Sequence, residues 1–174
     1  AQMLPETNWE ESWKDSYPPQ EVGRSLIVLP CWNADETRGR IPVILDPGLT
    51  FGTGAHPSTQ MCMEFMEDLV TPGCRVIDLG SGSGILSIAA LRLGAVGVDI
   101  DPKAESIARE NAAYNGLGPE QFSAFTGNVT EDARLMEQLA GDGYDLVLVN
   151  IVADVIISLA PVLKHFMKED ARFI

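Results

Sequence analysis

Two acidic residues and three glycines form the group in this chain that is best suited to chemistry. Asp78 is followed by Gly80, Gly82 and Gly84, and Asp99 comes 19 positions after Gly80. Glycines at this spacing allow a tight turn and let a ligand press against bare backbone. A carboxylate at the end of a following strand can accept hydrogen bonds from both hydroxyls of a ribose. The pattern therefore predicts a nucleoside-binding half site.

The glycine spacing and the charge ahead of it narrow the class of nucleoside. A dinucleotide fold favours GxGxxG, which places a helix N-terminus on a pyrophosphate, whereas this chain has GxGxG. Asp78 would repel a pyrophosphate but would pair with a ligand's ammonium group. We therefore expect a cofactor that carries an amino acid and no phosphate. In these features the pattern resembles class I methyltransferases, which use S-adenosylmethionine.

Alternating helix and strand patterns surround this motif and must position it. Strands are predicted at 75–79, 95–100, 122–126 and 144–150, and helices at 57–69, 85–93, 102–114, 131–139 and 151–166. This alternation predicts a doubly wound, mostly parallel α/β sheet of Rossmann-like type with right-handed crossovers. Residues 172–174 resemble the start of a further strand, so the sheet is expected to be cut short at its C-terminal end. In the first helix an apolar stripe is expected to face the core, formed by Met61, Phe65, Met66 and Leu69.

In an open parallel sheet, ligands bind beyond the carboxyl ends of the strands at the switch point of the topology. Asn150 ends the most apolar of the predicted strands, where an amide without a partner is costly. The candidate cofactor-binding residues from this reasoning are Asp78, Gly80, Gly82, Asp99, Asn128 and Asn150.

Residues 1–45 differ from the rest and are expected to form a lead-in to a catalytic domain at 46–174. Trp9 and Trp13 lie four residues apart, which suits one face of a short helix that Pro18 would end. Short β-like runs at 26–29 and 41–45 predict two strands joined by a polar loop.

The amino-acid composition limits the classes of partner that we expect for this protein. With 12 basic and 25 acidic residues the net charge is −13, which disfavours direct binding to nucleic acid and favours a basic protein partner. The start shows no signal-peptide pattern, and the longest apolar stretch falls short of the roughly 20 residues that span a bilayer. Three widely spaced cysteines form no metal-like cluster and are expected to be reduced and buried. We expect a cytoplasmic protein with neither a metal nor a membrane segment.

A second group of motifs carries a narrower resemblance. The loop FGTGAHPST at 51–59 leads into the first predicted helix, DLGSGSGIL stands at 78–86, and VDIDPKA at 98–104 is followed by Asn111 and Asn115. Together with Asn150, Ile151 and Val152, these segments closely resemble the ribosomal protein L11 methyltransferase family over nearly the whole chain.

The resemblance implies transfer of methyl groups from S-adenosylmethionine to lysine side chains and the N-terminal amine of a basic ribosomal protein. It implies cofactor contacts by Thr59, Gly80, Asp99 and Asn150, of which only Thr59 is new to the reasoning from strand ends. We expect no covalent intermediate and no indispensable side-chain base, with Asn150 as a possible substrate-orienting residue. His56, directly before Pro57, is expected to shape the turn rather than act as a general base.

The chain also departs from the family pattern. The stretch from Leu93 to Gly97 is a few residues short, and both the N-terminal recognition domain and the C-terminal strands are missing from the pattern, which suggests a catalytic-domain fragment. Alternative functions are methylation of another protein lysine or a small amine, and a noncatalytic nucleoside-binding interaction module. The GxGxG spacing disfavours a nicotinamide-dependent oxidoreductase. No oligomeric state follows from the sequence.

Overall fold

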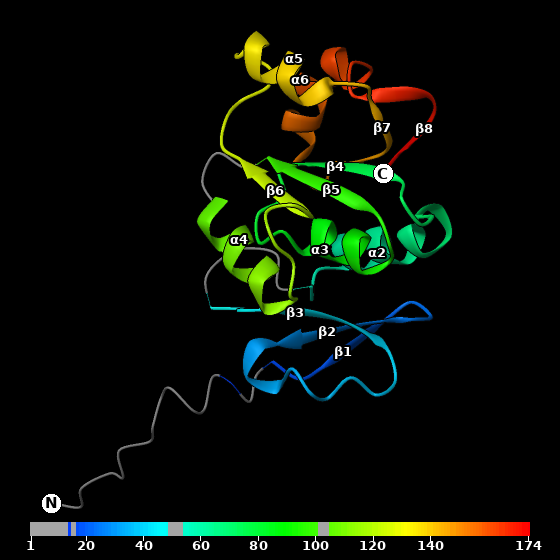
Figure 1. Ribbon diagram of the computed structural model, residues 1–174, viewed down its shortest axis with the longest axis vertical. Helices are drawn as coiled ribbons and strands as arrows, with labels where there is room; N and C mark the ends of the chain where they lie inside the picture. The colour runs from blue at the N-terminus through cyan, green and yellow to red at the C-terminus, as the bar shows by residue number, and fades with distance from the viewer. Residues whose placement is uncertain (1–13, 15–16, 49–53, 101–104) are drawn as a thin grey trace, which may run out of the picture.

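The computed structural model describes residues 14, 17–48, 54–100 and 105–174, and its centre is a five-stranded parallel sheet (Figure 1). The strand order is β6-β5-β4-β7-β8, and every neighbouring pair is parallel. The bounds are β4 Arg75–Leu79, β5 Val96–Ile100, β6 Phe122–Phe125, β7 Tyr144–Leu148 and β8 Met167–Phe173.

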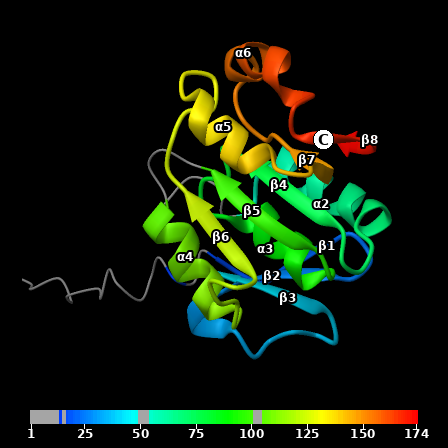
Figure 2. The same ribbon diagram turned by 45° about the horizontal axis from the view of Figure 1, so that its top comes forward.

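Helices cover both faces of this sheet. One face carries α2 (Pro57–Leu69), α3 (Ile85–Arg92) and α4 (Glu105–Tyr114), and the other carries α5 (Ala133–Ala140) and α6 (Ala153–Leu163) (Figures 1 and 2). Neighbouring strand residues divide between the two cores, since Val76 packs with the first group of helices and Ile77 with the second. The predicted doubly wound α/β fold is confirmed.

A small three-stranded sheet forms a further layer beyond α2, α3 and α4 (Figure 1). It contains β1 (Gln20–Val22), β2 (Leu26–Pro30) and β3 (Ile41–Leu45), with a 3-10 helix η2 (Cys31–Asn33) after β2. The two strands predicted in this region are confirmed, whereas β1 was not predicted because it has only three residues, two of them polar. The helix predicted around Trp9 and Trp13 lies outside the described residues.

Asn111 on α4 and Asn115 directly after this helix join the small sheet to the glycine turn. Asn115 accepts from the Ile44 N–H at 2.9 Å and donates to the Ile44 carbonyl at 2.7 Å, so its amide pairs with the outer edge of β3. One turn earlier, Asn111 accepts from the Asp46 N–H at 2.9 Å and donates to the Ser83 carbonyl at 2.8 Å. The lead-in is therefore bonded, through α4, to the turn that follows β4.

The bounds of α2 match the prediction, but its buried face differs from the expected stripe. Met66 is buried as predicted, whereas Met61 and Phe65 are 55% and 56% exposed, and Thr59 and Met63 are buried instead. Residues 59, 63 and 66 follow the i, i+4, i+7 spacing of one helix face. The prediction of the stripe was wrong at two positions because it followed hydrophobicity rather than the face that meets the sheet.

The C-terminal part differs from the prediction in its boundaries. Helix α6 ends at Leu163 rather than Phe166, with Pro161 inside it, and the last strand already begins at Met167 rather than Arg172. This strand was not predicted at its full length because its sequence, MKEDARF, is mostly polar. It pairs with β7 along one edge only. Among the described residues, the edge strand on this side of the sheet is therefore β8, with seven residues.

The return from α3 to β5 is made by only three residues, Leu93, Gly94 and Ala95. The turn is closed by hydrogen bonds from the Ala95 N–H to the Ala90 carbonyl at 3.0 Å and from the Gly73 N–H to the Gly94 carbonyl at 2.8 Å. Gly94 takes a φ of 107°, which an L side chain rarely adopts. The segment that looks short in sequence thus forms a complete turn.

The described helices include none that is both long and apolar enough to cross a membrane.

Among the cysteines only Cys74 is buried, while Cys31 and Cys62 are half-buried, so the expectation of three buried thiols was wrong for two of them. All three are free thiols.

Candidate functional site

The site lies where the direction of the sheet reverses. After β4 the chain builds β5 and β6 on one side, and then returns to place β7 and β8 on the other. The glycine turn follows β4, and Asn150 follows β7, so both lie at the carboxyl ends of the two strands that flank the switch point. A cavity of about 580 Å³ opens there, lined by His56, Ser58, Thr59, Asp78, Gly80, Ser81, Gly82, Ile85, Leu86, Asn150, Ile151, Val152 and Val155.

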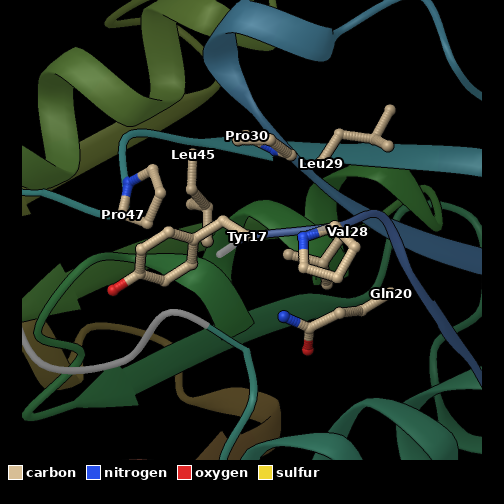
Figure 3. A pocket seen from close by; sticks show the side chains of 8 residues that line it. Tyr17, Gln20, Val28, Leu29, Pro30, Leu45 and Pro47 are labelled. Atoms are coloured by element: carbon tan, nitrogen blue, oxygen red, sulfur yellow. The ribbon is translucent and has the colours of Figure 1, made fainter. Parts of the chain in front are cut away.

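A second hollow lies on the small sheet and is far smaller. Figure 3 shows Tyr17, Gln20 and the prolines Pro30 and Pro47 around it. Its volume is about 10 Å³, which is space for about one water molecule. We therefore place the functional site at the switch-point cavity.

The glycine turn has a backbone that only glycine adopts readily. The φ angles of Gly80, Gly82 and Gly84 are 84°, 59° and 77°. A Cβ on Gly80 would lie 2.6 Å from Cγ2 of Ile151, and one on Gly84 would lie 3.2 Å from Cβ of Ala108. The turn therefore needs glycine at position 80 both for its backbone angle and for the close approach of the segment after β7.

Asp78 brings a negative charge into the cavity wall. It is 1% exposed, and its Oδ2 accepts a hydrogen bond from Ser87 Oγ at 3.1 Å. Its charge reaches Cys62, whose pKa is raised first by burial and then by Asp78. A buried carboxylate at a ligand cavity is suited to a cationic group of the ligand.

Ser81, in the middle of the turn, has a polar atom without a partner. Its Oγ is buried and makes no hydrogen bond within the described part of the chain. Buried hydroxyls are normally hydrogen-bonded, and one without a partner in a cavity wall points to a ligand that supplies one.

Side chains from two distant parts of the chain, residues 56–59 and Asn150, meet at the end of β7. Asn150 Oδ1 accepts from Ser58 Oγ at 2.8 Å, and Asn150 Nδ2 donates to Thr59 Oγ1 at 2.9 Å. His56 is the N-cap residue of α2, because its Nδ1 accepts from the Ser58 N–H at 3.2 Å, and the same Nδ1 lies 2.7 Å from Ser58 Oγ. The expectation that His56 shapes the turn is confirmed.

Five of the seven predicted cofactor-binding residues are brought together in the cavity wall. They are Thr59, Asp78, Gly80, Gly82 and Asn150.

The two remaining predicted residues are Asp99 and Asn128. Asp99 pairs with Asp78 in the ladder of β5 and β4, which places its backbone beside the site, but its side chain is outside the described part of the structure. Asn128 is exposed, is not among the lining residues, and its Oδ1 accepts from the Thr130 N–H and hydroxyl at 3.0 and 2.7 Å. Residues 51–53 of the predicted loop, residues 49–50 before it and residues 101–104 also lie outside the described part.

Reasoning from the sequence missed two polar and several apolar residues of the cavity wall. Ser58 stands next to the predicted Thr59, and Ser81 stands inside the glycine motif, so proximity was the available signal for both. The apolar contributors were not predicted to line the site either, although all of them except Val155 stand inside the quoted motifs; they are Ile85, Leu86, Ile151, Val152 and Val155. The described residues include no group of three or more His, Cys, Asp or Glu side chains that could hold a metal.

Comparisons with known proteins identify the family. A family model described as Ribosomal protein L11 methyltransferase (PrmA) matches residues 1–174. A ribosomal protein L11 methyltransferase from Ectopseudomonas mendocina is 41% identical over 99% of this chain and 57% of its own length. One from Symbiobacterium thermophilum is 42% identical over 97% of this chain and 54% of its own length. The chain thus spans about half the length of these curated relatives.

Solved structures agree with this assignment. The crystal structure of a ribosomal protein L11 methylase from Lactobacillus delbrueckii subsp. bulgaricus matches with a TM-score of 0.76 and 32% identity, covering 90% of this chain and 78% of that one. The C-terminal domain of a precorrin-6Y methyltransferase from Rhodobacter capsulatus, at 20% identity and a TM-score of 0.51, shares the fold over 66% of this chain and 60% of that one. The chain belongs to the ribosomal protein L11 methyltransferase family.

Proposed function

We propose that this chain binds S-adenosylmethionine and carries the catalytic part of an enzyme that methylates amino groups of ribosomal protein L11. The observation that carries the proposal is the cavity at the switch point, where the glycine turn and Asp78 face Asn150, in a chain matched over its whole length by the family model. The chain spans about half the length of its curated relatives, and the proposed activity is that of the whole protein that contains it.

The cavity fits a cofactor of this size and chemistry. Its volume of about 580 Å³ lies within the range of small-molecule sites, roughly 300–1,000 Å³. We assign the cofactor's ammonium group to Asp78, and its close contact with backbone to Gly80 and Gly82. The unpartnered Ser81 hydroxyl offers a further hydrogen bond to the ligand.

The remaining candidate residues are Asp99, Thr59, Asn150 and Asn128. Asp99 is assigned to the ribose hydroxyls, since its backbone stands beside Asp78 at the end of β5. Thr59 and Asn150 are assigned to the face of the site formed by α2 and β7, where they bond to each other. Asn128 would need to exchange its bond with Thr130 for one with the cofactor.

Bound S-adenosylmethionine supplies a methyl group on a positive sulfur, which is a good leaving group, so the protein's main work is alignment and exclusion of water. The apolar side chains of the cavity wall exclude water; they include Ile85, Leu86 and Ile151. The acceptor amine must arrive neutral, although an unperturbed lysine has a pKa of about 10.4. A desolvated cavity lowers that pKa, and the amide oxygen of Asn150 can accept a hydrogen bond from the neutral amine.

The charge of the chain supports the choice of substrate. A net charge of −13 favours a basic protein partner and disfavours direct contact with nucleic acid. We propose that the protein acts in the cytoplasm, that residues 1–45 serve as a lead-in, and that residues 46–174 form the cofactor-binding domain.

The test is methylation of ribosomal protein L11 purified in unmodified form. We expect mass spectrometry to show methyl groups on lysine side chains or the N-terminal amine after incubation with S-adenosylmethionine and the protein that contains this chain. Asn150→Ala is expected to lower the rate by about 10²-fold, because it removes a group that orients the reacting amine. The control is Ser158→Ala, which changes an exposed serine on α6.

Two results would contradict the proposal. Cofactor binding without transfer to ribosomal protein L11 would favour another amine substrate or a noncatalytic nucleoside-binding module. An Asn150→Ala variant with unchanged cofactor affinity and unchanged methylation would show that the site has been misplaced.

A further inference from the structure

We propose that Ser58 is a positioning residue for methyl transfer, whose hydroxyl holds the amide of Asn150 with one oxygen lone pair available to the acceptor amine. The inference rests on the proposed function and adds to it a residue that the sequence motifs did not assign. It starts from the contacts that Ser58 makes with His56 and Asn150.

The amide of Asn150 has two possible orientations, and they differ in chemistry. One orientation offers an acceptor where the other offers a donor. Its two protein neighbours, Ser58 Oγ at 2.8 Å and Thr59 Oγ1 at 2.9 Å, are both hydroxyls, and a hydroxyl can donate or accept. These two contacts alone therefore do not fix the orientation, and a third group is needed.

His56 supplies that third group. If Nδ1 of His56 carries a proton, it donates to Ser58 Oγ, 2.7 Å away, and the hydroxyl hydrogen of Ser58 is left for Asn150. If Nδ1 is unprotonated, it accepts from the Ser58 N–H at 3.2 Å, and the hydroxyl hydrogen of Ser58 lies within reach of both Nδ1 and Asn150 Oδ1. In the structure Ser58 Oγ is the donor toward Asn150 Oδ1 at 2.8 Å, the direction that a proton on Nδ1 enforces.

This donor selects one orientation of the amide. With Ser58 donating, Oδ1 of Asn150 must face Ser58, and Nδ2 must face Thr59, which is the arrangement observed. Oδ1 then keeps a second lone pair. Since Ser58, Thr59 and Asn150 all line the cavity, that lone pair is available to an amine that enters it.

The kinetic test compares Ser58→Ala with Ser58→Thr in the full chain. Ser58→Ala is expected to lower kcat for methylation of ribosomal protein L11 by about tenfold, since the acceptor amine loses its fixed partner. The affinity for S-adenosylhomocysteine and the melting temperature are expected to stay at the level of the Ser158→Ala control. Ser58→Thr keeps the hydroxyl and is expected to restore kcat.

A second readout does not depend on activity. In the unaltered protein the side-chain amide hydrogens of Asn150, assigned by NMR against Asn150→Ala, are expected to be protected from solvent exchange. Ser58→Ala is expected to speed their exchange by about fivefold, which corresponds to the loss of one hydrogen bond of about 1 kcal/mol. Ser58→Thr and Ser158→Ala are expected to leave the exchange unchanged.

The two readouts separate the possible failures. If the unaltered protein methylates no ribosomal protein, the proposed function fails, and the exchange rates still decide whether Ser58 holds Asn150. The inference on Ser58 is overturned if exchange in Ser58→Ala equals that of the unaltered protein. It is also overturned if kcat is unchanged in Ser58→Ala, or if the loss of kcat is not restored in Ser58→Thr.

Discussion

Gly80 defines the site at the scale of a single residue. Its φ of 84° ends β4 in a turn that any side chain would strain, and its missing Cβ leaves room for Ile151. Ile151 directly follows Asn150, so the close approach at Gly80 also fixes where the end of β7 lies. One glycine thereby brings both halves of the switch point into contact.

Gly80→Ala is expected to weaken cofactor binding and to destabilise the fold. The new Cβ would lie 2.6 Å from Cγ2 of Ile151, so the segment that carries Asn150 must move. We expect a loss of about 2–3 kcal/mol in unfolding free energy, and at least about tenfold weaker binding of S-adenosylhomocysteine. Chemical denaturation and calorimetric titration would measure the two effects.

The matched control is Gly73→Ala. Gly73 has a similar φ of 80°, but nothing lies within 4 Å of the Cβ that it would gain. It therefore reports the backbone strain alone, expected at about 1–2 kcal/mol, with cofactor affinity unchanged. Equal effects of the two substitutions on cofactor binding would show that the contact with Ile151 has no role.

The structure shows which of the predicted site residues line the cavity, and the reasons can be identified. Asp78, Gly80 and Gly82 belong to one short motif whose geometry is local, so their spacing was enough to predict them. Ser58 and Ser81 have roles that depend on which groups lie opposite them. Such partners are set by packing between elements, and a pattern along the chain does not contain them.

At the scale of an element, α2 is held at both of its ends. Its first turn carries Ser58 and Thr59, which bond to Asn150, and its last turns carry Glu67, whose side chain is 5% exposed. Glu67 accepts from the N–H groups of Arg24 and Ser25 at 2.8 and 2.6 Å and from Ser25 Oγ at 2.6 Å. The helix therefore links the turn between β1 and β2 to the switch-point cavity.

Glu67→Gln is expected to destabilise the protein by about 2 kcal/mol at pH 7, because an amide places a donor against groups that themselves donate. Burial by itself would raise the pKa of Glu67, but the hydrogen bonds from Ser25 and Arg24 and the charge of Arg24 outweigh it, so the pKa is lowered. A carboxyl with a lowered folded-state pKa stabilises the fold above its unfolded-state pKa.

The advantage of Glu67 over Gln is therefore expected to be full at pH 7. It should begin to shrink below the ordinary pKa of 4.5, and disappear as the pH falls through the folded-state pKa. Urea denaturation between pH 3 and 7 would be the measurement, with pH values chosen about these limits. Glu64→Gln, exposed on the same helix, is the control. A difference between Glu67 and Gln that does not change with pH would contradict this account.

At the scale of the whole molecule, the order of the strands creates the cavity. The chain adds β5 and β6 on one side of β4, and β7 and β8 on its other side. The loops that follow β4 and β7 therefore diverge at the carboxyl ends of these two strands. Asn115 bonds to β3 of the small sheet, and Asn111 bonds to Asp46 directly after β3 and to Ser83 in the glycine turn, so the small sheet supports the same region from the side of α4. The site therefore depends on the assembled layers rather than on one segment.

S-adenosylhomocysteine is expected to stabilise the assembled molecule, since the cavity is complete only in the folded state. At a hundredfold excess over its dissociation constant, the gain of about 2.7 kcal/mol corresponds to a rise in melting temperature of about 5–10 °C for a chain of this size. NAD at the same concentration is expected to leave the melting temperature unchanged, because Asp78 opposes a pyrophosphate. A thermal shift with NAD alone would overturn the assignment of the ligand.

The sequence by itself determined the alternation of helices and strands, the glycine turn with Asp78, and the position of Asn150 after an apolar strand. These follow from local backbone preferences and from the periodicity of hydrophobic residues, which act over a few residues. Only the tertiary structure decided that Ser58 meets Asn150, 92 positions away, that Met61 and Phe65 face outward, and that MKEDARF is a strand. The physical reason is that burial and hydrogen-bond partners depend on which surfaces pack together, and that is a property of the whole chain.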